Sequence, residues 1–165
     1  MIKEITGDAI KSAISLRLRS GFATTSGIPP VTTYPTIYKE QIVQGFSLPC
    51  FHIRQVNVDQ RHGLNNNFFR DYYMEVSYHV DQTADDLRKQ LDAVGSKALE
   101  VLSSVPIVVT DDLTPVTLSL RGRDMGFQVI EEVMVLLVTY TIQAKSSLSS
   151  VTDMATLDLD QAIKD

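Results

Sequence analysis

Apolar residues recur at helical spacing in two segments of the chain, residues 2–20 and residues 83–103. A stripe of this kind is typical of a helix that buries one face and leaves the other in water. Thr83, followed three residues later by Asp86, also predicts a capping box at the start of the second helix. The stripe residues are Ile2, Ile5, Ala9, Ala13 and Leu16 in the first helix and Leu87, Leu91, Val94, Ala98, Val101 and Leu102 in the second.

Six further segments favour β-strands. The clearest covers residues 68–80, where apolar and polar residues alternate and predict one buried face and one largely polar face. The longest, residues 127–144, is apolar on both faces in its middle. This is expected either of a central strand covered on both sides or of a strand whose second face meets a partner subunit. The other predicted strands are residues 36–43, 50–60, 106–110 and 115–121, with turns at residues 61–67 and 122–126.

The order of these elements predicts an α+β fold, in which a mostly antiparallel sheet carries the two main helices on one face. Residues 21–36 hold three prolines and two glycines, and they predict a long N-terminal loop or arm. Residues 145–152 have the composition of a linker, and residues 153–164 favour a short helical tail. We therefore expect a single domain over residues 1–144, followed by a linker and tail over residues 145–165.

Composition and charge narrow the class of protein. The chain has 165 residues, a net charge of −5 and a pI of about 5.1, so it lacks the basic footprint of a nucleic-acid-binding protein. Its one cysteine, Cys50, cannot form an internal disulfide. The first residues lack the apolar core of a signal peptide, and the longest apolar run, residues 133–142, is shorter than the roughly 20 residues of a membrane span. These features predict a soluble protein of a reducing compartment, with no membrane partner.

The sequence offers few candidates for chemistry. Cys50 and His52 fall on one face of a strand, which permits a thiol nucleophile with a histidine base, although a lone cysteine is more often a small buried side chain. Glu131 and Glu132 are expected on opposite faces of the long strand, with at least one of them buried or at an interface and paired with an arginine. The candidate arginines are Arg70, Arg121 and Arg123. We expect no enzyme activity, no cofactor and no metal.

One stretch is more specific than these patterns. It consists of Tyr38, Glu40, Ile42, Gln44-Gly45-Phe46, Pro49-Cys50-Phe51 and Ile53. This block resembles the start of the phage tail terminator family, which occurs in phages, defective prophages and tail-like bacteriocins. The order that follows is also similar, with an aromatic-rich strand, a helix, a strand that ends in Leu120-Arg121-Gly122 and a long closing strand. The resemblance covers about residues 38–144.

The resemblance implies a structural virion protein. Members of the family form a ring, commonly of six subunits, that caps the head-proximal end of the tail tube, stops its polymerisation and presents a joining surface to the head or neck. The implied partners are further copies of the chain, the tail tube protein, and a neck, head-completion or sheath protein. DNA would pass through the lumen without specific binding. The implied location is the virion, after assembly in the cytoplasm of the host bacterium.

Three surfaces are candidate contacts in such a ring: the turn at residues 44–49, the apolar face of residues 133–138, and the arm at residues 21–36. The candidate contact residues are Glu40, Gln44, Gly45, Phe46, Pro49, Glu131, Glu132, Val133, Val135 and Leu137. Two alternatives stay open. One is a neck or head-completion connector of a phage or tail-like particle, and the other is a small monomeric binding module or an enzyme that uses Cys50.

Overall fold

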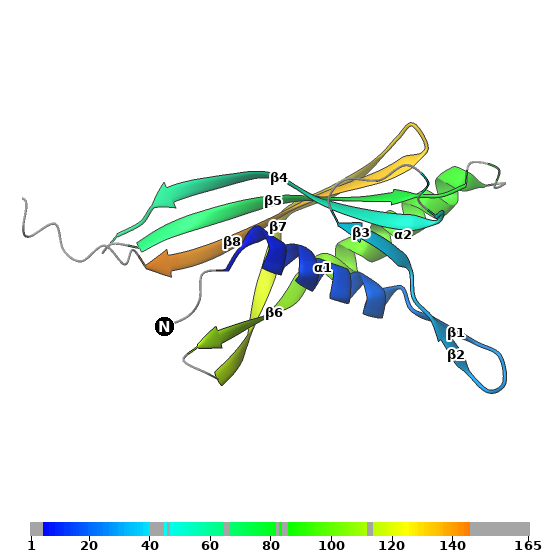
Figure 1. Cartoon of the computed structure of the whole chain (residues 1–165). Coiled ribbons are helices and arrows are strands. Elements are labelled where there is room, and N and C mark those ends of the chain that lie inside the picture. Colours follow the sequence, from blue (N-terminus) through cyan, green and yellow to red (C-terminus); the bar gives the residue numbers. More distant parts are fainter. Residues whose placement is uncertain are drawn as a thin grey trace, which may run out of the picture.

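The computed structural model describes residues 5–39, 45, 47–64, 67–81, 83, 86–111 and 114–145. Within these ranges, a six-stranded sheet carries two helices on one face, and a two-stranded hairpin projects from the domain (Figure 1). The predicted α+β fold is therefore confirmed. The elements are α1 Gly7–Gly21, β1 Thr24–Ser26, β2 Val31–Thr33, β3 Thr36–Lys39, β4 Cys50–His62, β5 Asn67–His79, α2 Leu87–Leu102, β6 Ser104–Asp111, β7 Thr114–Ile130 and β8 Val133–Lys145.

The large sheet has the strand order β3-β4-β5-β8-β7-β6. All neighbouring strands are antiparallel except β3 and β4, which are parallel. The register pairs Cys50 with His79 and His79 with Val133, so the start of β4, the end of β5 and the start of β8 lie at one end of the sheet. The turn between β7 and β8 lies at the same end, which we call the Glu131 end.

The core lies between the inner face of the sheet and the two helices. Its largest fully buried side chains come from both layers and include Phe51, Met74, Leu136 and Tyr140 of the sheet and Leu91 of α2. Of the stripe predicted for α2, Leu91, Ala98 and Leu102 are buried, and Leu87, Val94 and Val101 pack against the core. The orientation predicted for α2 is therefore confirmed.

The first helix begins later than the sequence pattern predicts. The side chain of Thr6 accepts a hydrogen bond from the backbone nitrogen of Ala9, so Thr6 caps the helix and Ile5 precedes it. The buried stripe is also rotated, because Leu16 is 65% exposed. The fully buried residues are Ile10, Ile14 and Leu18.

The capping box predicted for α2 is wrong. The residue before the helix is Asp86, which has a left-handed φ of 64° and makes no capping hydrogen bond through its side chain. The backbone nitrogen and hydroxyl of Thr83 donate instead to the carboxylate of Asp81, two residues earlier. This local turn competes with the capping geometry, as short polar side chains commonly do.

The turn predicted at residues 122–126 and the single strand predicted at residues 127–144 are both wrong. Strand β7 continues through residues 122–126, where the register with β8 shifts at a bulge. The chain turns at Glu131 and Glu132, whose φ angles of 47° and 64° are the left-handed values that a tight hairpin turn needs. The two glutamates therefore join two strands instead of interrupting one.

Residues 21–36 were predicted to form a long loop or arm. In the structure, β1 and β2 pair within this range as an antiparallel hairpin. Gly27 takes a φ of 87° at its turn. At the other end of the chain, β8 runs to Lys145, one residue into the predicted linker. The rest of the predicted linker and tail lies outside the described residues, so the domain boundary stays a prediction.

Candidate assembly surface

The sheet has one uncovered face. Figure 1 shows both helices on the same side of it, and we call the opposite side the outer face. Along β8, Met134, Leu136 and Val138 are buried against the core, and the residues that alternate with them point outward. The outward residues are Val133, Val135 and Leu137, which we call the apolar stripe.

The exposure of the apolar stripe bears on the two interpretations of this strand that the sequence leaves open. Strand β8 is central in the sheet, because it pairs with β5 on one side and β7 on the other. Its outer side chains are nevertheless only partly covered in the described chain: Val133 and Val135 are half-buried and Leu137 is 47% exposed. Strand β8 is apolar on both faces, but the described chain covers only one of them. This arrangement favours the interpretation in which the second face meets a partner subunit.

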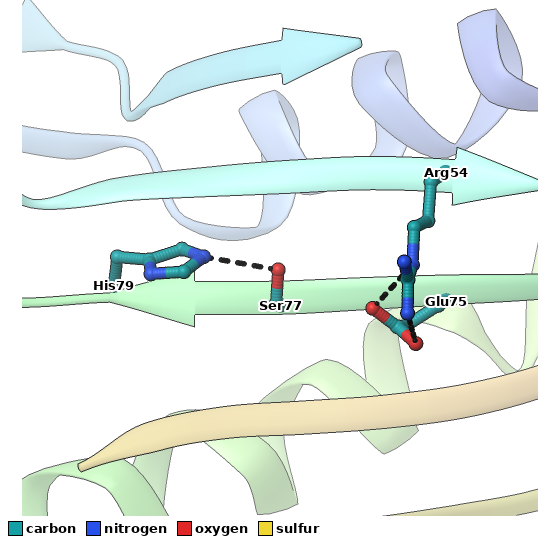
Figure 2. Close-up of polar contacts among 4 residues, drawn as sticks. All are labelled: Arg54, Glu75, Ser77 and His79. Carbon is teal, nitrogen blue, oxygen red and sulfur yellow. Dashed lines mark hydrogen bonds and ion pairs between the residues drawn. The ribbon is translucent and has the colours of Figure 1, made fainter. Parts of the chain in front are cut away.

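Next to the apolar stripe, the outer face of β5 is polar but pairs its charges. Arg54 of β4 donates two hydrogen bonds of 2.7 Å to the two carboxylate oxygens of Glu75 (Figure 2). Arg61 binds the carboxylate of Asp71 at 2.7 Å, and the hydroxyl of Thr141 donates to the same carboxylate at 2.7 Å. The bidentate geometry of Arg54 and Glu75 is specific in direction, so this pair holds its two side chains in place.

The Glu131 end of the outer face carries two histidines. The Nε2 atom of His79 lies 3.1 Å from the hydroxyl oxygen of Ser77 (Figure 2). Burial, and then the nearby His52, lower the pKa of His79 below its ordinary value. At neutral pH the ring of His79 is therefore uncharged, which keeps positive charge away from the adjacent start of the apolar stripe.

A small hollow opens where β4 bulges. The register between β4 and β5 shifts between Gln55 and Asn57, so Val56 has no partner of its own. The hollow has a volume of about 190 Å³, and none of the described residues that line it is charged. Its lining residues are Val56, Asn57, Tyr73, Met74, Leu137, Val138 and Thr139. Leu137 thus belongs to both the apolar stripe and the hollow.

The structure brings two of the predicted contact groups together. Pro49 directly precedes β4, so it lies at the Glu131 end of the sheet, as do Glu131 and Glu132. Both glutamates are exposed, so neither is buried within the single chain, and the other predicted possibility, a position at an interface, stays a prediction. Gly45 has a φ of 96°, which glycine adopts without strain. Of the predicted contact residues, Glu40, Gln44 and Phe46 lie outside the described residues.

The comparison with known proteins gives the family of the chain. The sequence model of a family described as phage tail terminator protein matches residues 9–150, which cover α1 from its third residue and every later helix and strand to the end of β8. The chain belongs to the phage tail terminator family. No curated protein matches it. A tail terminator family is a family of structural tail proteins, so the chain is a structural component of a phage tail and has tail components as its partners.

The described residues also bear on the reactive, metal-binding and membrane-spanning groups that were considered for this chain. Cys50 is fully buried, and burial raises the pKa of its thiol, which disfavours the thiolate that a nucleophile requires. Among the described residues, no three histidine, cysteine, aspartate or glutamate side chains lie close enough to hold a metal ion. Neither described helix is long and apolar enough to cross a bilayer.

The paired charges and the hollow of the outer face are not apparent from the sequence. Arg54 and Glu75 are 21 residues apart, and only the register of β4 against β5 places them side by side. The hollow depends on the bulge at Val56, which an even alternation of residues does not indicate. A usable signal was the unbroken apolar run at residues 133–138, which did predict the apolar stripe.

Proposed function

We propose that this protein assembles as a ring, commonly of six copies, at the head-proximal end of the tail tube. The ring stops polymerisation of the tube and presents a joining surface to the head or neck. Membership of the tail terminator family supports the tail role. The observation that carries the assembly step is the apolar stripe, which the helices of a single described chain leave uncovered.

The proposed mechanism is geometric. A ring closes when one surface of a subunit binds a different surface of the next subunit and the rotation between them completes a circle. The outer face supplies one such surface. The Glu131 end, with Pro49, Glu131 and Glu132, is our candidate for contact with a neighbouring ring, together with Glu40, Gln44, Gly45 and Phe46, which precede Pro49 in the sequence.

The charge of the chain fits passage of DNA through such a ring. Proteins hold DNA chiefly by neutralising its phosphates with lysine and arginine. This chain has a net charge of −5, and two arginines of the outer face already bind carboxylates. A lumen with an excess of acidic side chains offers phosphates little attraction, so DNA passes without being held.

Two measurements on the full chain test this function. Light scattering after size exclusion should give a mass near six times 18.4 kDa, either for the free protein or for the species released from tube ends. Electron microscopy of purified tube protein should show that added protein sits at one end of each tube and arrests growth. Unchanged tube lengths and bare ends would refute the proposal, whereas binding only to tubes that already carry a terminator would favour a connector.

A pair of variants makes the tube assay specific. Leu137→Asp places a charge in the apolar stripe and should abolish capping. Leu64→Asp changes a residue that is 87% exposed in the turn between β4 and β5, at the opposite end of the sheet from Glu131, and it should cap normally. Equal activity of both variants would remove the apolar stripe from the mechanism.

A further inference from the structure

The β1–β2 hairpin exposes apolar side chains that the rest of the described chain does not cover. Every residue from Thr24 to Tyr34 is exposed, and Ile28, at the turn, is fully exposed. Val31 of β2 and Tyr34, which directly follows β2, are more than half exposed. A two-stranded hairpin of this kind is at best marginally stable by itself. These features are expected of an element that gains its packing from another surface.

The hairpin and its flanks form an uncharged segment. Residues 20–38 contain no aspartate, glutamate, lysine or arginine, although 21% of the whole chain is charged. Burial of this segment against another protein therefore removes no charge from water, which is the largest penalty that such a contact can carry. A positive charge lies beside the hairpin, because the guanidinium of Arg19 is 5.5 Å from the centre of the ring of Tyr34.

The hollow of the outer face has matching properties. Its lining is uncharged, and its volume of about 190 Å³ is of the size that accepts one branched or aromatic group, since a cavity of ~150 Å³ holds benzene. Asp59 lies beside it, where the amide of Asn57 donates to its carboxylate at 3.0 Å. Arg61 and Asp71 also lie near Tyr73 of the hollow but pair with each other, so Asp59 leaves a net negative charge beside the hollow. Arg19 places a positive charge beside the hairpin, which makes the two surfaces complementary.

We propose that the hairpin of one copy inserts Ile28 into the hollow of the next copy. This inference rests on the ring of the proposed function and names the contact that builds it. The hairpin points away from the sheet on the side of α1, whereas the hollow lies on the outer face, so a chain cannot fill its own hollow (Figure 1). An apolar projection and a complementary pocket on different sides of one molecule make a head-to-tail contact, which closes into rings.

Two charge variants test the direction of the contact. Ile28→Asp disables the projection and Leu137→Asp disables the hollow, so each should weaken self-association by at least about tenfold, because a buried aspartate lacks a partner. An equimolar mixture should form a dimer and no larger species, since only the intact hairpin of one variant and the intact hollow of the other can meet. Leu64→Asp is the control and should associate as the unmodified chain does.

Cysteine cross-linking covers the case in which the free protein associates only weakly. Chains with Ile28→Cys are mixed with chains that carry Val56→Cys and are oxidised mildly, and chains with Leu64→Cys mixed with the same Val56→Cys chains are the control. The first mixture should form a disulfide-linked pair at least about tenfold faster than the control, because a docked contact raises the local concentration of the two thiols. Cys50 does not compete, since it is fully buried. Equal rates in the two mixtures would overturn the inference.

The outcomes separate this contact from the proposed function. If Ile28→Asp caps tubes and forms rings as the unmodified chain does, the inference fails and the ring survives. If the Ile28–Val56 cross-link forms but the protein never caps tubes, the contact stands and the terminator role fails. If Ile28→Asp forms rings but loses capping, the hairpin binds the tube protein and not a second copy, which also overturns the inference.

Discussion

Replacement of Tyr140 by Phe tests how the strand that carries the apolar stripe is held to the helical layer. Tyr140 is fully buried on β8, and its hydroxyl donates a 2.8 Å hydrogen bond to the carbonyl oxygen of Leu102, the last residue of α2. Tyr140→Phe keeps the ring and removes this bond. Loss of one buried hydrogen bond, with a carbonyl left unpaired, costs about 1–2 kcal/mol of unfolding free energy.

Urea unfolding followed by circular dichroism measures the change. The midpoint should fall while the slope stays constant, because the exposed area of the unfolded chain is the same. Tyr34→Phe is the matched control, since Tyr34 is exposed and its substitution should change the unfolding free energy by less than about 0.5 kcal/mol. A loss below about 0.5 kcal/mol for Tyr140→Phe would refute the argument that this bond joins the two layers.

The same variant predicts a change in alkaline stability. Burial raises the pKa of Tyr140 above its ordinary value of 10. Above pH 10 the unfolded chain releases this phenolic proton while the folded chain keeps it, so the folded state loses about 1.4 kcal/mol of stability for each pH unit. Tyr140→Phe removes that contribution. The unfolding free energy of the variant should therefore fall less steeply above pH 10, and parallel curves would contradict the burial argument.

Two further changes test the turn and the paired charges. The double variant Glu131→Asn with Glu132→Gly places the residues preferred in a tight hairpin turn at two left-handed positions. Its unfolding temperature should therefore rise by an amount that corresponds to about 0.5–1.5 kcal/mol of unfolding free energy. The same variant should cap tubes poorly if the Glu131 end contacts the neighbouring ring. A double-mutant cycle of Arg54→Ala and Glu75→Ala should give a coupling free energy of about 0.5–1 kcal/mol in unfolding. This coupling should shrink in high salt, because Arg54 is largely exposed and salt screens exposed charges. A coupling unaffected by salt would argue against an ion pair.

Sequence patterns predicted the elements that bury a single regular face. Residues 68–80 alternate because β5 has the core on one side, and α2 shows its stripe because one side of the helix meets the sheet. The sequence pattern gave wrong predictions where pairing between strands that are distant in sequence determines the backbone conformation. Glycines at residues 122 and 126 suggest a turn by themselves, whereas pairing of β7 with β8 makes this stretch a bulge within a strand.

The candidate surface was predictable in composition but not in geometry. The apolar run at residues 133–138 shows that both faces of a strand are apolar, and the structure shows which three residues point outward. Glu131 and Glu132 are not residues that usually form tight hairpin turns, so the sequence placed them inside a strand. The hollow beside Val56 depends on a bulge and on three strands at once, and no local pattern reports it.

The size of the exposed apolar area explains why assembly would depend on the tube end. Full burial of a large aliphatic side chain contributes about 1.5–3 kcal/mol, so the half-exposed Leu137 with its two half-buried neighbours contributes about 2 kcal/mol, and Ile28 adds about 2 kcal/mol. Association of two proteins costs about 4 kcal/mol or more in lost freedom of motion. One contact therefore barely offsets that cost. A closed ring gives every subunit two such contacts, and a tube end that holds several subunits in place removes much of the cost, so capping should begin at protein concentrations at which the free chain is still monomeric.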